Sequence, residues 1–203
     1  MIVIIDYGLG NVRSISAKIE QMGEDVMISN RIPDIESADK LILPGVGAFD
    51  AGIKNLNLLG ITAFLKERLH KEKIPILGIC LGMQLFTRKS EEGVLTGLEL
   101  ISADTVKFTI EKTTSISVPH MGWNTIQIKN DSWIIQNIKN NSRFYFAHSY
   151  HLKCDTTDNV VAITHYCYDF PSIIEKEHII GVQFHPEKSH SQGLQILKNF
   201  VRY

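Results

Sequence analysis

Short apolar runs alternate with amphipathic stretches through the first half of the chain. The apolar runs lie at residues 2–5, 25–28, 40–43 and 74–79, and they are rich in Ile, Val and Leu. Residues 11–22 and 61–71 instead repeat apolar side chains at helical spacing. Strands that alternate with helices are typical of a parallel sheet with helices packed on it.

The second half of the chain has a different pattern. Short strand-like runs occur at residues 105–110, 124–128, 143–147, 160–165 and 179–184, with one short helical stretch at 132–138 and a closing helix at 192–201. Antiparallel strands added to the parallel sheet are the simplest arrangement. We therefore predict one α/β domain over residues 1–203. It has an open, mostly parallel twisted sheet with helices on both faces and antiparallel additions in the second half.

Composition excludes several classes of protein. The 203 residues are 44% hydrophobic with a formal net charge of -1, so no overall field drives binding to nucleic acid or to an anionic membrane. The longest apolar runs fall short of the roughly 18 residues that span a bilayer. The first residues lack the basic segment of a secretory signal. Three cysteines without a Cys-x-x-Cys pair make neither a disulfide framework nor the usual zinc site, and we expect a cytoplasmic protein.

One cysteine stands in a motif that carries chemistry. Gly78, Cys80 and Gly82 have the spacing of a nucleophile elbow, in which a strand turns sharply into a helix and exposes the middle side chain. The helix N-terminus stabilises a thiolate there, and the N–H of Leu81 points toward an oxyanion formed at the cysteine. The alternative is a small buried residue at a tight junction.

A histidine follows the last predicted strand of the sheet. His185 lies at a strand end, where open α/β sheets place their sites, and Glu187 lies two residues further on. A carboxylate there accepts the second imidazole N–H and fixes the tautomer of a general base. Without Cys80, a histidine in a surface loop is the simpler interpretation.

Two other stretches invite a metal or a cofactor, and we predict neither. His148 and His151 are three residues apart, but on a strand that spacing directs the side chains to opposite faces. The turn at residues 6–11 lacks the last glycine of a dinucleotide-binding loop, because Arg13 occupies that position.

Taken together, these motifs resemble a known family. Residues 78–84 and 181–189 are similar to the two catalytic motifs of class I, triad-type glutamine amidotransferases. Residues 6–11 and 119–124 further resemble the glutaminase subunits of imidazole glycerol phosphate synthase, and residues 44–49 and 148–150 fit as well. The resemblance extends over nearly the whole chain.

The resemblance implies a role for each matching residue. Cys80 attacks the side-chain amide of L-glutamine, His185 transfers the proton, and Glu187 orients His185. The γ-glutamyl thioester is then hydrolysed to glutamate. The implied oxyanion donors are the N–H groups of Val46 and Leu81, and the implied glutamine-binding residues are Gly47, Gln84, His148, Ser149 and Tyr150.

The resemblance also implies a partner. Ammonia passes to a (β/α)₈ cyclase subunit in a heterodimer, and Asn11, Met121, Trp123 and Lys188 match the docking face. Judged without the family, Met121 and Trp123 are ordinary core or edge residues. An oxyanion donor is worth about 10²–10³ in kcat. We therefore expect that a loop such as residues 45–47, whose glycines make a peptide flip cheap, keeps the enzyme quiet until the partner docks.

The chain departs from the family pattern at two positions. Glu99 and Cys167 stand where glycines are common, which bears on how the second-half loops follow the family. Three rival functions remain open: a paralogous glutaminase that feeds another synthase, such as a sugar amidotransferase of surface-glycan synthesis; a Cys–His γ-glutamyl peptidase; and a catalytically silent scaffold subunit.

Overall fold

The computed structural model describes residues 1–110 and 116–203. The strands are β1 (Ile2–Ile5), β2 (Val26–Ser29), β3 (Lys40–Leu43), β4 (Ile76–Ile79), β5 (Ala103–Lys107), β6 (His120–Thr125), β7 (Gln127–Ile128), β8 (Arg143–His148), β9 (Tyr150–Cys154), β10 (Val160–His165), β11 (Asp169–Lys176) and β12 (Ile179–Val182). The helices are α1 (Val12–Glu20), α2 (Ile32–Glu36), α3 (Phe49–Leu58), α4 (Ile61–Glu72), α5 (Leu81–Leu85) and α6 (His190–Arg202), with 3₁₀ turns η1 (Trp133–Ile135) and η2 (Pro186–Lys188).

The main sheet has both parallel and antiparallel parts. Within the described residues its eight strands run in the order β2-β1-β3-β4-β12-β11-β10-β7. The pairs from β2 to β12 are parallel, whereas β11, β10 and β7 are antiparallel to their neighbours. This confirms the predicted α/β fold class and the antiparallel additions in the second half.

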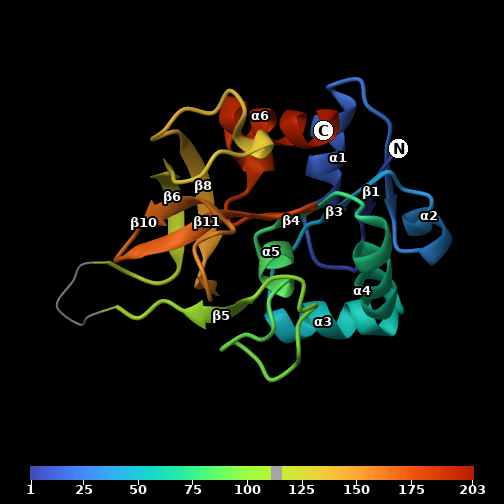
Figure 1. The fold of residues 1–203 in the computed structure, drawn as a ribbon, viewed down its shortest axis with the longest axis horizontal. Helices are drawn as coiled ribbons and strands as arrows, with labels where there is room; N and C mark the ends of the chain where they lie inside the picture. The colour runs from blue at the N-terminus through green and yellow to red at the C-terminus, as the bar shows by residue number, and fades with distance from the viewer. Residues whose placement is uncertain (111–115) are drawn as a thin grey trace.

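Helices cover both faces of the sheet. Figure 1 shows α1 and α6 on one side of the strands and α3, α4 and α5 on the other. The alternation along β1 explains the two cores. Ile2 and Ile4 pack in one hydrophobic cluster with residues of α1 and α6, and Val3 and Ile5 pack in the other with residues of α3 and α4. Because both faces are buried, the strand is apolar at every position.

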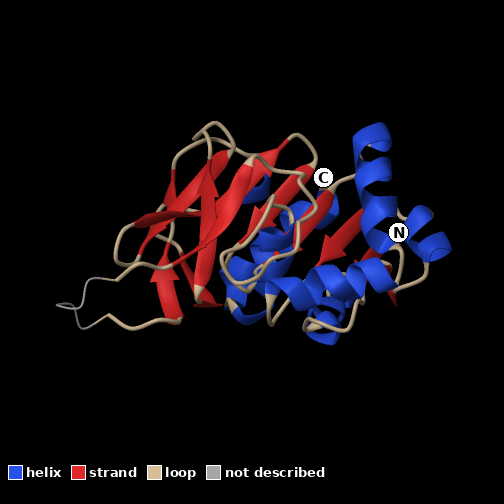
Figure 2. Cartoon of the chain, turned by 90° about the horizontal axis from the view of Figure 1, so that it is seen from below, coloured by secondary structure: helices blue, strands red, loops and turns tan. Residues whose placement is uncertain are grey.

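Some predicted elements differ from the structure. The strands expected at residues 105–110 and 143–147 do not extend the main sheet: β5 pairs with β9 and β8 pairs with β6 in two small antiparallel sheets. Figure 2 shows most strands gathered at one end of the molecule, away from the N-terminal helices. The helix expected at residues 132–138 is the single turn η1, which ends because Gln136 leaves the helical conformation with ψ 130°.

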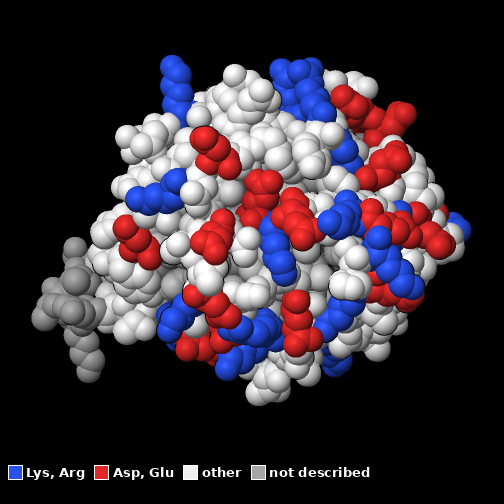
Figure 3. All heavy atoms as spheres, in the orientation of Figure 1, with Lys and Arg blue, Asp and Glu red and all other residues white. Residues whose placement is uncertain are grey.

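The carboxyl ends of β3, β4 and β12 meet at one edge of the sheet. Cys80 follows β4, and its N–H donates to the carbonyl of Val182 at the end of β12 over 2.8 Å. This edge therefore collects the segments that carry the sequence-predicted site. No helix in the described part of the chain is long and apolar enough to cross a membrane. On the face seen in Figure 3, Lys and Arg side chains lie among Asp and Glu side chains.

Candidate active site

Cys80 lies in a strained strand-to-helix turn. Its φ of 54° is in the left-handed region, between the end of β4 and the start of α5. The flanking glycines permit the turn. A Cβ on Gly82 would lie 1.7 Å from the carbonyl oxygen of Leu43, and one on Gly78 would lie 2.5 Å from the ring of Phe86. This is the geometry of a nucleophile elbow, with a cysteine at its apex.

His185 and Glu187 form the second part of the site. The backbone N–H of His185 donates to the carbonyl of Tyr145, which joins the end of the main sheet to β8. Nδ1 of His185 lies 3.0 Å from Oε1 of Glu187. Both side chains are almost fully buried, and Oε2 of Glu187 has no hydrogen-bond partner among the residues that the structure describes. The carboxylate therefore interacts with the imidazole and with little else.

The charge state of His185 follows from these contacts. Burial lowers its pKa, but hydrogen bonds to Cys80 and Glu187, together with their negative charges, outweigh burial and raise the pKa to about 10. The imidazole of His185 therefore carries both of its ring protons at neutral pH. Its proton is available for a leaving group.

A cavity of about 560 Å³ opens over Cys80 and His185. The predicted residues that line it are Val46, Gly47, Cys80, Leu81, Gln84, Met121, His148, Ser149, Tyr150, His185 and Lys188. Glu187 lies behind His185, and Asn11 and Trp123 do not line the cavity. The structure therefore brings together most of the residues that the sequence singled out in separate segments.

The two expected oxyanion donors do not both point into the cavity. The N–H of Leu81 donates to the carbonyl of Gly45 over 3.3 Å. In a trans peptide the C=O and the next N–H point in opposite directions, so the N–H of Val46 points away from Leu81. With this orientation of the Gly45–Val46 peptide, the N–H groups of Val46 and Leu81 do not point to one site in the cavity. A flip of this peptide, as predicted from the glycines of the loop, would turn the N–H of Val46 toward Leu81.

Tyr7 supports the Pro44–Gly45 segment of this loop. Its hydroxyl donates to the carbonyl of Pro44 over 2.7 Å. Burial, and then the nearby charge of Cys80, raise the pKa of Tyr7 well above its ordinary value, so the hydroxyl keeps its proton. Gly45 packs so closely that an added Cβ would lie 2.5 Å from the Tyr7 oxygen. The loop conformation is therefore fixed by contacts with residues distant in sequence.

A chain of hydrogen bonds fixes the wall of the cavity that lies at the junction of β8 and β9. Nδ1 of His148 lies 2.8 Å from the carbonyl oxygen of Tyr150, and its Nε2 lies 3.0 Å from Nδ1 of His120. Since a carbonyl only accepts, His148 carries its proton on Nδ1. Burial lowers the pKa of His148 to about 3 and that of His120 to about 4. Both rings are therefore neutral and have fixed tautomers at neutral pH.

Three residues near the site were missed by sequence reasoning. Tyr7 is one of them, as described above. Glu92 lines the cavity, and its Oε2 accepts the backbone N–H of Phe49 over 2.7 Å. Gln183 is fully buried between Gln84 and Cys80. A polar glutamine at the end of an otherwise apolar strand was the available signal for Gln183, whereas Glu92 reaches the site from a loop that no pattern marks.

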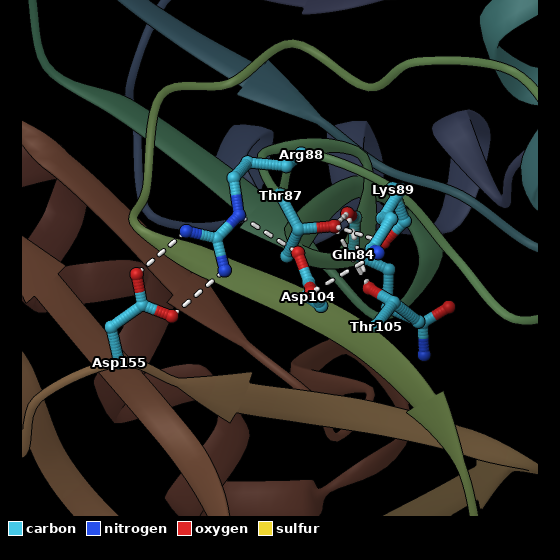
Figure 4. A network of polar contacts seen from close by, with 7 residues as sticks. All are labelled: Gln84, Thr87, Arg88, Lys89, Asp104, Thr105 and Asp155. Carbon is cyan, nitrogen blue, oxygen red and sulfur yellow. Dashed lines mark hydrogen bonds and ion pairs between the residues drawn. The ribbon is translucent and has the colours of Figure 1, made fainter.

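Helix α5 carries Gln84, and a polar network holds the segment that follows this helix (Figure 4). The guanidinium of Arg88 binds both carboxylate oxygens of Asp155 over 2.6 and 2.8 Å and donates to Asp104 over 2.8 Å. The buried hydroxyl of Thr87 donates to the carbonyl of Gln84 over 2.8 Å. This network ties the end of the elbow helix to β5 and to the residue that follows β9.

Of the proposed docking residues, Met121 and Lys188 line the cavity, whereas Trp123 and Asn11 do not. On β6, Met121 is 63% exposed and Trp123 is 38% exposed. The indole of Trp123 stacks on His190 with ring centroids 5.0 Å apart. Nζ of Lys188 lies 5.7 Å from the ring centroid of Tyr145. Met121 both lines the cavity and faces solvent, so a partner that covers this face also covers the cavity.

The histidines considered as metal ligands have other partners. His151 bonds through Nδ1 to the carbonyl of Leu152 and through Nε2 to the hydroxyl of Tyr168, whereas His148 bonds to Tyr150 and His120. Among residues 1–110 and 116–203, no group of three or more His, Cys, Asp or Glu side chains is arranged to hold a metal ion.

An elbow cysteine, a buried His–carboxylate pair and a mixed α/β sheet define a class of enzyme. The sequence profile of the family described as "Glutamine amidotransferase class-I" matches residues 3–203, and the chain belongs to this family of glutaminases. Solved structures agree on the fold: a putative GMP synthase protein from Thermoplasma acidophilum (TM-score 0.73, 20% identity, 99% of this chain and 92% of that one) and PurLQS from Thermotoga maritima (TM-score 0.72, 16% identity, 100% and 97%).

Curated relatives narrow the family. The chain is 48% identical to imidazole glycerol phosphate synthase subunit HisH 2 of Methanococcus maripaludis over 100% of this chain and 99% of the relative. It is 45% identical to subunit HisH 1 of Campylobacter jejuni over 100% of both chains, and 42% identical to subunit HisH 2 of Pseudomonas aeruginosa over 99% and 98%. Within the class I glutamine amidotransferases, the chain therefore belongs to the HisH subunits of imidazole glycerol phosphate synthase.

Proposed function

We propose that the chain hydrolyses L-glutamine with a Cys80–His185–Glu187 triad and delivers the ammonia to a cyclase partner for imidazole glycerol phosphate synthesis. The observation that carries the proposal is the buried His185–Glu187 pair beside an elbow cysteine, at the floor of one cavity. Membership in the HisH subunits supports the reaction and the partner. The three cysteines, all in the described part of the chain, are unpaired, which suits the reducing cytoplasm, where we place the reaction.

The proposed chemistry begins at the sulfur. The Cys80 thiolate attacks the side-chain amide carbon of glutamine, and the His185 imidazolium protonates the departing ammonia. Water activated by the then neutral His185 attacks the thioester, and glutamate leaves as the thiolate re-forms. Glu187 keeps His185 in the required orientation. The raised pKa of His185 favours its charged form. This form suits the release of ammonia, because the proton that the ammonia takes up is already on the ring.

The cavity also suits the α-amino acid end of glutamine. Among the described residues that line it, Glu92 is the acidic side chain and Lys188 the basic one. In the proposal, Glu92 attracts the α-ammonium group of the substrate. Gln84, Gly47 and residues 148–150 line the rest of the cavity as the expected glutamine-binding positions. A carboxylate that already accepts one backbone N–H is held in place for this contact.

The orientation of the Gly45–Val46 peptide suggests how the partner could control the rate of glutamine hydrolysis in the proposal. For both Val46 and Leu81 to donate to an oxyanion, the Gly45–Val46 peptide has to rotate and release the N–H of Leu81. We infer that docking of the cyclase on the face that includes Met121, Trp123, Lys188 and Asn11 drives this rotation. Each donor is worth about 10²–10³ in kcat, so the undocked subunit hydrolyses glutamine slowly.

The test compares glutamate release by the purified chain alone and with the cyclase subunit of the same organism and its nucleotide ligand. We expect stimulation of at least about 10²-fold. Cys80→Ala should abolish synthesis from glutamine but retain synthesis from added ammonia. Glutamine-dependent synthesis by that variant would exclude Cys80 as the nucleophile.

A second candidate is a paralogous glutaminase that serves another synthase. Methanococcus maripaludis has two relatives, subunits HisH 1 and HisH 2, at 44% and 48% identity to this chain, so such subunits occur in pairs. If the cyclase gives no stimulation while a glutamine analogue still alkylates Cys80, the chemistry stands and the ammonia acceptor is a different enzyme.

A further inference from the structure

Gln183 places a buried amide beside the reactive sulfur. It follows the apolar strand β12, its backbone N–H donates to the carbonyl of Ser172 over 2.9 Å, and its side chain is fully buried. Its Nε2 lies 3.8 Å from Sγ of Cys80, within hydrogen-bond range for sulfur. No step of the triad chemistry described above uses this residue.

The orientation of the Gln183 amide is fixed by its neighbours. Nε2 of Gln84 donates to the carbonyl of Tyr150 over 2.9 Å and to Oε1 of Gln183 over 3.2 Å. Because a carbonyl only accepts, the nitrogen of Gln84 has to face Tyr150, and the oxygen of Gln183 has to face that same nitrogen. A flipped Gln183 would set two NH₂ groups against each other. The N–H of Gln183 therefore points at the sulfur.

The contact of the sulfur with Ala147 has the opposite preference. Sγ of Cys80 lies 3.9 Å from the carbonyl oxygen of Ala147. That carbonyl accepts only from the protonated thiol, whereas the N–H of Gln183 donates best to the thiolate. Since the site is buried, a donor of fixed orientation stabilises the charged form more than it would in water.

We propose that Gln183 is a further catalytic residue that stabilises the Cys80 thiolate through its side-chain N–H and is held in register by Gln84. The same contact favours the sulfur as a leaving group when water cleaves the thioester, because the hydrogen bond re-forms as charge returns to Sγ. Gln84 lines the glutamine cavity and also holds Gln183. Substrate binding and nucleophile activation therefore share one chain of hydrogen bonds. This inference rests on the proposed nucleophilic role of Cys80.

The experiment measures alkylation of Cys80 by iodoacetamide against pH, with the Cys80 peptide quantified by mass spectrometry. Gln183→Met removes the donor at similar volume and should move the midpoint of the profile up by about one pH unit, which reduces alkylation about tenfold at pH values well below the wild-type midpoint. Gln183→Glu keeps the acceptor for Gln84 but sets a carboxylate against the sulfur, so it should move the midpoint further in the same direction. Ser172→Ala removes a neighbouring buried hydroxyl that has no hydrogen-bond partner within residues 1–110 and 116–203, and it should leave the profile unchanged.

The outcomes separate this inference from the proposed function. A purely structural role for Gln183 would lower alkylation equally at every pH, and an unmoved midpoint in Gln183→Met and Gln183→Glu would overturn the inference while Cys80 remains the nucleophile. A wild-type Cys80 that is not alkylated at any pH would overturn both. If Gln183→Met unfolds by circular dichroism, the profile of Gln183→Leu, which also removes the donor and adds no charge, decides.

Discussion

At the scale of single residues, burial and neighbouring groups determine the charge states and tautomers of the polar side chains near the cavity. His120 and His148 are neutral because they are buried, whereas His185 is charged because two anionic groups face it. The sequence indicated Cys80 and His185, since each follows an apolar strand in a recognisable motif. It did not indicate Glu92 or Gln183, since their roles arise from contacts between segments far apart in the chain.

The buried histidine pair predicts a loss of stability in mild acid. Unfolded histidine has a pKa near 6.5, and the folded pKa values are about 4 for His120 and about 3 for His148. Between pH 6.5 and 4 the unfolded state therefore binds more protons, and the free energy of unfolding falls as pH falls, by up to about 1.4 kcal/mol per pH unit for each histidine. Urea unfolding at pH 7 and pH 5 measures this loss.

His120→Gln is the matched variant for that measurement, because it removes one of the two titrating rings. Its loss of stability between pH 7 and pH 5 should be smaller than that of the wild type. An equal loss in the two proteins would show that His120 does not titrate abnormally.

The left-handed backbone of Glu99 is a second case at this scale. Its φ is 57°, a conformation that favours glycine, and glycine is the usual residue at this position of the family pattern. An ion pair between its Oε2 and Nζ of Lys66 over 2.8 Å accompanies the strain. The loop therefore holds Glu99 in a backbone conformation that a glycine would adopt without strain.

At the scale of elements, strands were easier to predict than the helices and edges that depend on tertiary contacts. The structure confirms predicted strands 40–43 and 160–165 residue for residue. Helix α3 was not predicted, because Gly52 and two asparagines weaken its local propensity and its first N–H is capped by Glu92 from a distant loop. Strand β11 was not predicted, because it contains Pro171. Elements α2 and β9 were also missed.

The elbow depends on the close approach of α5 to β3. In Gly82→Ala the new Cβ would lie 1.7 Å from the carbonyl oxygen of Leu43. The clash is with backbone, which cannot move aside as a flexible side chain can. We therefore expect the free energy of unfolding to fall by more than about 3 kcal/mol. Thermal or urea unfolding followed by circular dichroism measures it.

Gly60→Ala is the control for this prediction. Nothing lies within 4 Å of its added Cβ, but its φ is +71°, so only backbone strain of about 1 kcal/mol is added. Similar losses in the two variants would mean that the elbow is not packed as described.

At the scale of the whole molecule, the proposed triad and two of the proposed docking residues belong to different sheets. Cys80, His185 and Glu187 follow the ends of β4 and β12 in the main sheet, whereas Met121 and Trp123 lie on β6 of a two-stranded sheet. The sequence predicted the class of fold from its alternating pattern. It could not give the separate pairing of β6 with β8, because strand partners in the second half are set by long-range packing rather than by local pattern.

Truncation of the exposed β6 side chains should weaken docking without disturbing the triad. Met121→Ala and Trp123→Ala should each lower the affinity for the cyclase about tenfold or more, since large side chains near the centre of an interface dominate binding. Titration calorimetry measures the affinity, and alkylation of Cys80 checks that the site is intact. Met27→Ala, at an exposed position on the edge strand β2, should bind as the wild type does. Unchanged affinity in both β6 variants would place the interface elsewhere.

The alternation along β6 has a consequence for how such proteins diverge after gene duplication. His120 faces inward and takes part in the hydrogen-bond chain of the cavity, whereas Met121 and Trp123 face outward. If the cyclase docks on β6 as proposed, mutations at the outward positions change what the copy recognises while the inward positions preserve its chemistry. A duplicated gene product can therefore acquire a new recipient for its nitrogen through a few surface substitutions, and the ancestral reaction is inherited intact.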